Sequence, residues 1–117
     1  MEWNVIFDPD FRLWFDEREE ELKDEIFSVL SLLRESGLAL GRPRVDTLKG
    51  SSIKNMKELR IQYKGEPWRI LFAFDPKRQA ILLLGGNKTV KKRWYEENIP
   101  IAERRYENYI KKLKEEE

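Results

Sequence analysis

The candidate chemical groups of this chain are cations, carboxylates and phenols, because the sequence contains neither histidine nor cysteine. Histidine is the usual side chain for proton transfer near neutral pH. Any acid–base chemistry must therefore use Lys, Arg, Tyr, Asp or Glu with shifted pKa values. The missing cysteines exclude a thiolate nucleophile, a disulfide framework and a Cys-based metal site.

Three strand-like runs, 56–64, 68–75 and 80–86, are predicted from alternating apolar residues and short turn candidates between the runs. We place the turns at Gly65-Glu66 and at Asp75–Gln79. The first hairpin then pairs Leu59 with Phe72, and the second pairs Phe74 with Ile81. This register predicts one buried face, made of Leu59, Ile61, Ile70, Phe72, Phe74, Ile81 and Leu83.

The opposite face of the predicted sheet carries Glu58, Arg60 and Arg69, and the two arginines are diagonal neighbours, about 7–8 Å apart at the backbone. Two like charges that close repel each other, so an anion between them is a natural partner. Gly86 lies beside Arg69 in this register and would leave space for a ligand. The alternative is an exposed face decorated with solvated arginines, and the neighbouring Leu71 and Ala73 fit that alternative poorly.

A second group of cations follows the last strand. Trp94 and Tyr95 add aromatic surface beside it, which suits stacking on RNA bases. The alternatives are a basic loop before a helix and, for Trp94, packing in the core. We predict that RNA-binding residues come from this segment and from the loop before residue 56: Lys49, Lys54, Lys91, Lys92 and Arg93.

The remaining chain predicts a strand near Trp3–Phe7 and helical structure from Phe11 to about Glu35, with a joint in the acidic run 16–21. Segment 38–52 is expected to be mostly loop, with a short strand near Val45. A last helix is predicted from Pro100, a favoured first helical residue. The fold class is α+β, in the order β-α-α-β-β-β-α, with a mostly antiparallel sheet and the helices on one face.

Charge is unevenly distributed, although the net charge of the whole chain is only +1. Residues 1–41 carry 4 basic and 11 acidic side chains, whereas residues 42–93 carry 14 basic and 4 acidic ones. A local excess of this size suits a polyanion partner. The alternative is that basic strands merely pair with acidic helices.

Length and hydropathy favour one domain, spanning 1–117, in the cytoplasm. No apolar run approaches the roughly 20 residues of a membrane helix, and the acidic start does not resemble a signal peptide. We therefore expect no membrane partner.

Several short motifs together resemble the RelE/HigB toxin superfamily, most closely its phage-derived HigB-like subgroup. The resemblance covers roughly residues 3–112, and the order and spacing of the motifs carry it. They are Leu40-Gly41-Arg42-Pro43, Leu48-Lys49-Gly50, Lys57-Glu58-Leu59-Arg60, Trp68-Arg69-Ile70-Leu71-Phe72, Leu84-Gly85-Gly86-Asn87-Lys88 and Trp94-Tyr95.

The resemblance implies an endoribonuclease that cuts mRNA on the ribosome and is inhibited by an antitoxin, expected to be a small helix-turn-helix protein. By the same resemblance Arg69 contacts the scissile phosphate. The other catalytic candidates are Arg60, Lys57, Lys88 and Tyr95; no cofactor and no metal are expected. The run 89–93 departs from the family pattern.

The sequence therefore predicts attack of a ribose 2′-hydroxyl on the adjacent phosphate, with the arginines stabilising the transition state. Lys57 or Lys88 could be the base, and Tyr95 could assist the leaving group or stack on a base. One alternative is the gyrase-inhibiting, ParE-like branch of the superfamily. Another is a non-catalytic RNA- or ribosome-binding module.

Overall fold

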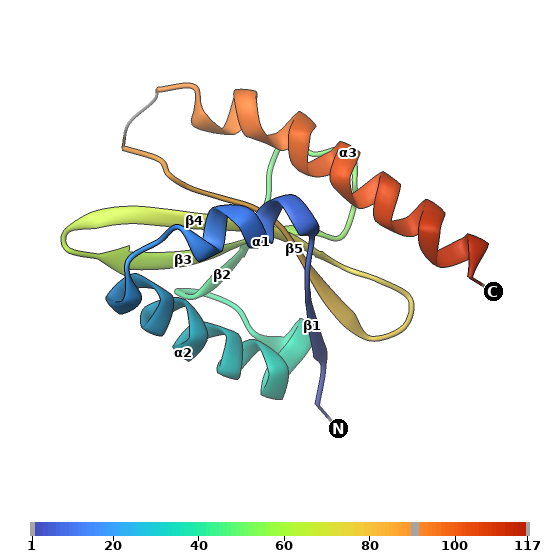
Figure 1. Cartoon of the computed structure of the whole chain (residues 1–117), viewed down its shortest axis with the longest axis horizontal. Helices are drawn as coiled ribbons and strands as arrows, with labels where there is room; N and C mark the ends of the chain where they lie inside the picture. Colours follow the sequence, from blue (N-terminus) through green and yellow to red (C-terminus); the bar gives the residue numbers. More distant parts are fainter. Residues whose placement is uncertain (1, 90–91, 117) are drawn as a thin grey trace.

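The computed structural model describes residues 2–89 and 92–116 and has the predicted α+β class (Figure 1). Its five strands lie in the order β1-β5-β4-β3-β2, and all neighbours are antiparallel except β1 and β5. The elements are β1 (Asn4–Phe7), α1 (Pro9–Asp16), α2 (Glu20–Ser36), a 3-10 turn (Gly37–Ala39), β2 (Val45–Thr47), β3 (Met56–Tyr63), β4 (Glu66–Phe74), β5 (Gln79–Asn87) and α3 (Trp94–Glu115).

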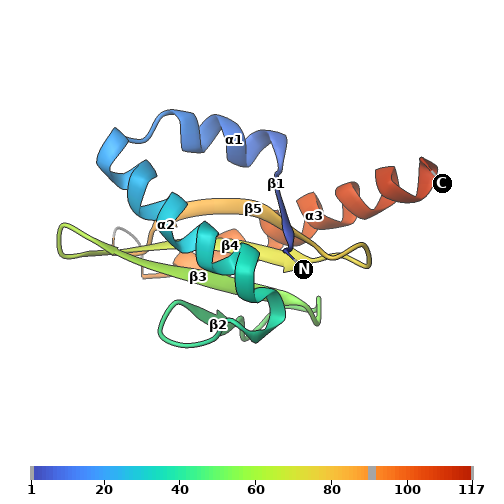
Figure 2. The same ribbon diagram turned by 90° about the horizontal axis from the view of Figure 1, so that it is seen from below.

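The helices cover both faces of the sheet, so the prediction that they share one face is wrong. α1 and α2 pack on one side, and α3 packs on the other (Figures 1 and 2). The cause lies in β4, where Ile70 and Phe72 are buried on the α2 side while Leu71 and Ala73 are buried on the α3 side. A strand that is apolar on both faces needs cover on both.

The first hairpin closes at Lys64-Gly65, one residue earlier than predicted. Both turn residues have positive φ, 51° and 76°, which is the backbone of a two-residue turn whose twist matches the strands. Leu59 therefore pairs with Ile70 rather than with Phe72. The pairing slips by two residues, so every side chain keeps its predicted face.

The second hairpin follows the predicted register only at residues 68–71 of β4. Arg69 lies opposite Gly86 as expected, but an irregularity between Leu71 and Phe72 shifts the pairing, and Phe72 faces Leu82. Ile81 and Leu83 consequently pack on the α3 side. All seven residues predicted to be buried are buried, but on two faces rather than one.

The helix boundaries agree with the sequence except in α3. Residues 17–19 separate α1 from α2, inside the predicted acidic joint, and Gly37 follows α2. α3 begins at Trp94, six residues before the predicted start, and Pro100 lies inside it. The burial of Trp94 and Ile99 against the sheet outweighs the backbone hydrogen bond that a proline removes.

No helix in the described part of the chain is both long and apolar enough to cross a membrane.

Two glycines test the hairpin register. Gly65→Ala should lower the free energy of unfolding by about 1 kcal/mol, since alanine is strained at positive φ. Gly41→Ala is the matched control, because Gly41 also has open space around its Cα but is not among the glycines with positive φ. Chemical denaturation of both variants measures the difference, and equal stabilities would contradict the assigned turn.

Candidate active site

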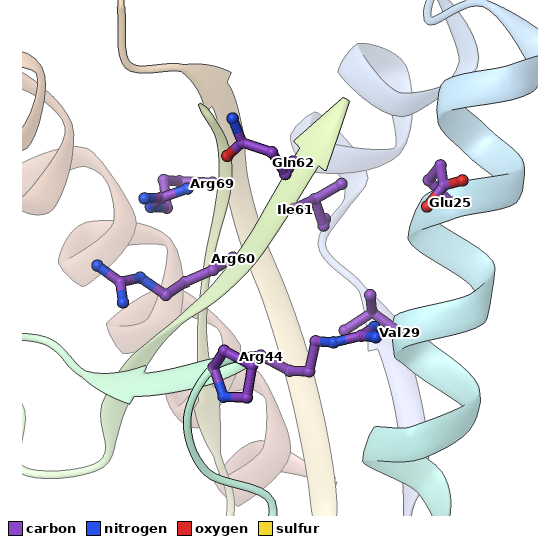
Figure 3. A pocket seen from close by; sticks show the side chains of 8 residues that line it. Glu25, Val29, Arg44, Arg60, Ile61, Gln62 and Arg69 are labelled. Atoms are coloured by element: carbon purple, nitrogen blue, oxygen red, sulfur yellow. The ribbon is translucent and has the colours of Figure 1, made fainter. Parts of the chain in front are cut away.

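Arg60 and Arg69 lie directly opposite each other on β3 and β4. The Arg60 N–H donates to the carbonyl of Arg44 on the far side of β3, at 2.8 Å, so it points away from β4. The two arginines therefore form a non-hydrogen-bonded pair, for which the Cα atoms are typically about 4.5 Å apart. Their side chains extend from the same face (Figure 3), closer together than the predicted diagonal arrangement.

Glu58 holds Arg69 in place. It lies two residues before Arg60 on the same face of β3, and its Oε1 is 3.0 Å from Arg69 Nε. Both side chains are less than a tenth exposed. Arg69 Nη1 also donates to the Trp68 carbonyl at 3.0 Å. A buried carboxylate thus compensates the charge of one arginine of the pair.

Tyr95 joins this pair from the first turn of α3. Its hydroxyl donates a 2.7 Å hydrogen bond to the same Oε1 of Glu58. Burial, with a further contribution from that hydrogen bond, raises the pKa of Tyr95 to about 12. The phenol is therefore protonated at neutral pH.

Lys88 follows β5 and reaches the same place. Its N–H donates to the Pro67 carbonyl at 3.1 Å, and its Nζ lies 5.5 Å from the centroid of the Tyr95 ring. Burial lowers the pKa of Lys88, and the positive charges of Arg69 and Arg60 lower it further. The negative charge of Glu58 opposes this change in part.

We call Glu58, Arg60, Arg69, Lys88 and Tyr95 the arginine site. It lies at the end of the sheet where α3 begins, and a cavity of about 500 Å³ opens against Arg60 and Arg69. Arg60 Nε is buried and has no hydrogen-bond partner within the described residues. A buried donor without a partner is costly, so an incoming anion would find an unsatisfied charge here.

Glu58 is the residue of the arginine site that the sequence prediction missed. Its position on the arginine face was predicted by alternation, but it was not proposed as part of the site. The available signal was a single carboxylate among cations on that face. An isolated acid there indicates an ion pair, because buried charges are almost always paired.

Lys57 is the catalytic candidate that the structure does not bring to this site. It lies on β3 between Met56 and Glu58, so alternation places it on the opposite face, with Leu59 and Ile61. It lines a smaller cavity beside the loop that precedes β2. Of the two lysines predicted as the base, Lys88 is therefore the one that lies at the arginine site.

Gly86 does not open the space that we predicted for a ligand. A Cβ built on Gly86 would come within 2.7 Å of Trp94 Nε1, so the indole occupies that position. Trp94 is buried in the core. Gly86 therefore allows α3 to begin close to the sheet, which places Tyr95 beside Glu58.

The four predicted RNA-binding residues that the structure describes are scattered. Lys92 is exposed and shares a shallow pocket with Lys88 and Tyr95, and Arg93 is exposed and paired with Glu96 at 3.7 Å. Lys49 and Lys54 are exposed on the loop between β2 and β3. That loop runs along α3 toward Tyr106, away from the arginine site. Lys91 lies outside the described residues.

Comparison with known proteins gives the family. Residues 13–107 match the family described as phage derived protein Gp49-like. The chain belongs to this family. It is also 49% identical over 107 residues to a Mycobacterium tuberculosis protein named as a candidate toxin, HigB3, and this match covers 91% of the chain and 92% of that relative. The predicted RelE/HigB superfamily is thereby confirmed.

Two further relatives extend the comparison of this Gp49-like chain. A second M. tuberculosis protein, named as candidate toxin HigB2, is 44% identical over 99 residues; the match covers 83% of the chain and about half, 49%, of that relative. The structure of a mutant of the E. coli toxin RelE in the free state aligns with a TM-score of 0.55 at 13% identity. That alignment covers 82% of this chain and 94% of the RelE chain, and it shows that the fold is shared.

A double-mutant cycle tests the buried pair of this Gp49-like protein. Glu58→Gln and Arg69→Met should each lower the free energy of unfolding by about 3 kcal/mol or more, because each leaves a buried charge uncompensated. The double variant should lose clearly less than the sum, with a coupling of about 2 kcal/mol. Denaturant unfolding of the four proteins gives the cycle, and additive losses would show that the pair does not interact.

Proposed function

We propose that this protein is the toxin of a type II toxin–antitoxin system and acts as a metal-independent endoribonuclease on mRNA in the ribosome. The observation that carries the proposal is the direct cross-strand pair of Arg60 and Arg69, with Lys88 and Tyr95 beside it. Membership of a family whose relatives are named as toxins supports it. The basic segment 42–93 suits the approach of RNA.

In the proposed reaction a ribose 2′-oxygen attacks the adjacent phosphorus while the bond from phosphorus to the 5′-oxygen breaks. The products are a 2′,3′-cyclic phosphate and a 5′-hydroxyl. Arg60 and Arg69 stabilise the charge that develops on the phosphate oxygens, the usual role of cationic clamps in phosphoryl transfer. Glu58 is a positioning residue, because it contacts Arg69 and Tyr95.

Two side chains of the arginine site suit the proton transfers. Lys88 accepts the 2′-hydroxyl proton, since its lowered pKa increases the neutral fraction. Tyr95 has a raised pKa and keeps its proton, so it can donate that proton to the leaving 5′-oxygen. Its present hydrogen bond to Glu58 fixes the phenol close to Arg69.

An antitoxin partner follows from the same proposal. The toxins of such systems are inhibited by a cognate protein, which we expect to be a small helix-turn-helix protein. Acidic side chains on that partner would suit the basic segment, because complementary charge speeds association.

Substitution of the two arginines tests the proposal. Arg69→Ala and Arg60→Ala should each lower the cleavage rate about 100- to 1,000-fold, the loss typical for one transition-state donor. The measurement is cleavage of mRNA in a purified translation system. Arg42→Ala is the matched control, since Arg42 is exposed and its Nη2 is ion-paired with Asp46 at 2.9 Å.

Arg69→Ala also leaves the buried carboxylate of Glu58 without its ion-pair partner. Circular dichroism must therefore confirm that this variant folds. Arg60 Nε has no hydrogen-bond partner within the described residues, and Arg60→Ala keeps the test valid if Arg69→Ala unfolds. Full activity in folded Arg60→Ala would remove the arginine pair from the mechanism. Inhibition of translation without cleavage would favour the non-catalytic module, and inhibition of gyrase supercoiling would favour the ParE-like branch.

The pH dependence of cleavage tests Lys88. The rate should rise with pH as Lys88 loses its proton, and it should level off below the ordinary lysine pKa of 10.5 because the pKa is lowered. Lys88→Arg should lose this rise, since arginine stays charged throughout. Lys92→Arg is the control, because Lys92 lines the same shallow pocket as Lys88. A rise that persists in Lys88→Arg would assign the base to another group.

A further inference from the structure

The cavity at the arginine site continues over the edge of the sheet toward α2. Besides Arg60 and Arg69, its walls include Val29 of α2, Pro43, Arg44 and Ile61 (Figure 3). The volume of about 500 Å³ lies within the range usual for small-molecule pockets, about 300–1,000 Å³. The cavity is therefore larger than one phosphate group requires.

The cavity lies where β3 has lost its neighbouring strand. β2 pairs with residues 57–59 of β3 and extends no further; beyond it, the Arg44 carbonyl still accepts from the Arg60 N–H. The backbone of Gln62 has the same orientation as that of Arg60, because it is two residues further along the strand. It therefore faces this open edge, and the Gln62 side chain lines the cavity.

Arg44 is a third arginine, and its backbone lies beside that of Arg60, on the side away from Arg69. Its backbone partner is Arg60, whose own cross-strand partner is Arg69. The Arg44 side chain is exposed and extends toward Val29 (Figure 3). No ion pair involves Arg44 in the described ranges, whereas Arg42 two residues earlier is ion-paired with Asp46.

We propose that Arg44 binds a second phosphate of the RNA and that the cavity holds the nucleotide between this phosphate and the scissile one. Two observations carry this inference: an uncompensated cation at the far end of the cavity, and the buried, unpartnered Nε of Arg60 at the near end. It rests on the function proposed above, which it deepens by assigning a substrate subsite.

The walls between the two ends fit a nucleoside. Pro43 is exposed and offers apolar surface for a ribose or a base, whereas Val29 and Ile61, which also line the cavity, are almost fully buried. The side-chain amide of Gln62, and its backbone groups at the open edge of β3, can hydrogen-bond to base edges, as proteins do with unstacked RNA bases. Glu25 also lines the cavity; its carboxylate disfavours a phosphate there and can accept from a base amino group.

The inference is tested with short 2′-O-methyl RNAs, which cannot undergo the reaction. A dinucleotide supplies one internucleotide phosphate, and trinucleotides extended on the 5′ or the 3′ side supply two. The wild-type protein should bind one of the trinucleotides about tenfold more tightly than the dinucleotide. Arg44→Ala should lose that gain and keep the dinucleotide affinity, while Arg42→Ala should keep both.

Salt dependence provides a second readout. For the favoured trinucleotide, Arg44→Ala should reduce the slope of log affinity against log salt by about 0.7, the value for one lost phosphate contact on a single strand. Arg42→Ala should leave the slope unchanged. A matched loss in Arg42→Ala would show a general charge effect and overturn the subsite.

The outcomes separate this inference from the function on which it rests. A dinucleotide that does not bind wild-type protein would count against the arginine site itself. Dinucleotide binding with no gain from either extension would overturn only the Arg44 subsite. A hexaglutamate peptide that binds with Arg44 dependence, when neither trinucleotide does, would overturn it in favour of an acidic protein partner.

Discussion

The ion pair between Glu58 and Arg69 is the interaction on which the site depends. Antiparallel pairing brings Arg60 and Arg69 directly opposite each other, an arrangement that like charges disfavour. The buried carboxylate of Glu58 compensates one of them and also accepts the hydrogen bond from Tyr95. Because buried ion pairs contribute little net stability, we attribute to this one a role in geometry. It orients Arg69 and leaves the charge of Arg60 available to a ligand.

The rest of the fold brings these groups together from distant parts of the chain. The two-residue turn at Lys64-Gly65 sets the pairing of β3 with β4. Gly86 lets Trp94 pack closely on the sheet, and Trp94 in turn fixes the first turn of α3, where Tyr95 lies. The apolar part of the same face is covered by α3, and the end that carries the arginines opens onto the cavity.

On β3 and β4 the sequence predicted the face of each residue better than its cross-strand partner. Alternation placed Arg60, Arg69 and Glu58 on one face, and it survived the error in the first turn because the pairing slipped by two residues. The irregularity after Leu71 could not be predicted, since local pattern does not reveal an extra residue in one strand. The start of α3 was missed because burial of Trp94 prevailed over the preference of Pro100 for a first turn. Lys57 was assigned by resemblance against the alternation of its own strand, and alternation was correct.

The proposed cleavage through a ribose 2′-hydroxyl at the arginine site can be tested by a single substitution in the substrate. Ribosomes programmed with an mRNA would be incubated with the protein, and the cut position would be mapped together with its end groups. The same mRNA would then be prepared with a single 2′-deoxy nucleotide on the 5′ side of that cut. Attack by the 2′-oxygen should leave a 2′,3′-cyclic phosphate on the ribose substrate and give no cleavage at the deoxy position. Cleavage of the deoxy substrate at the same position and rate would contradict it.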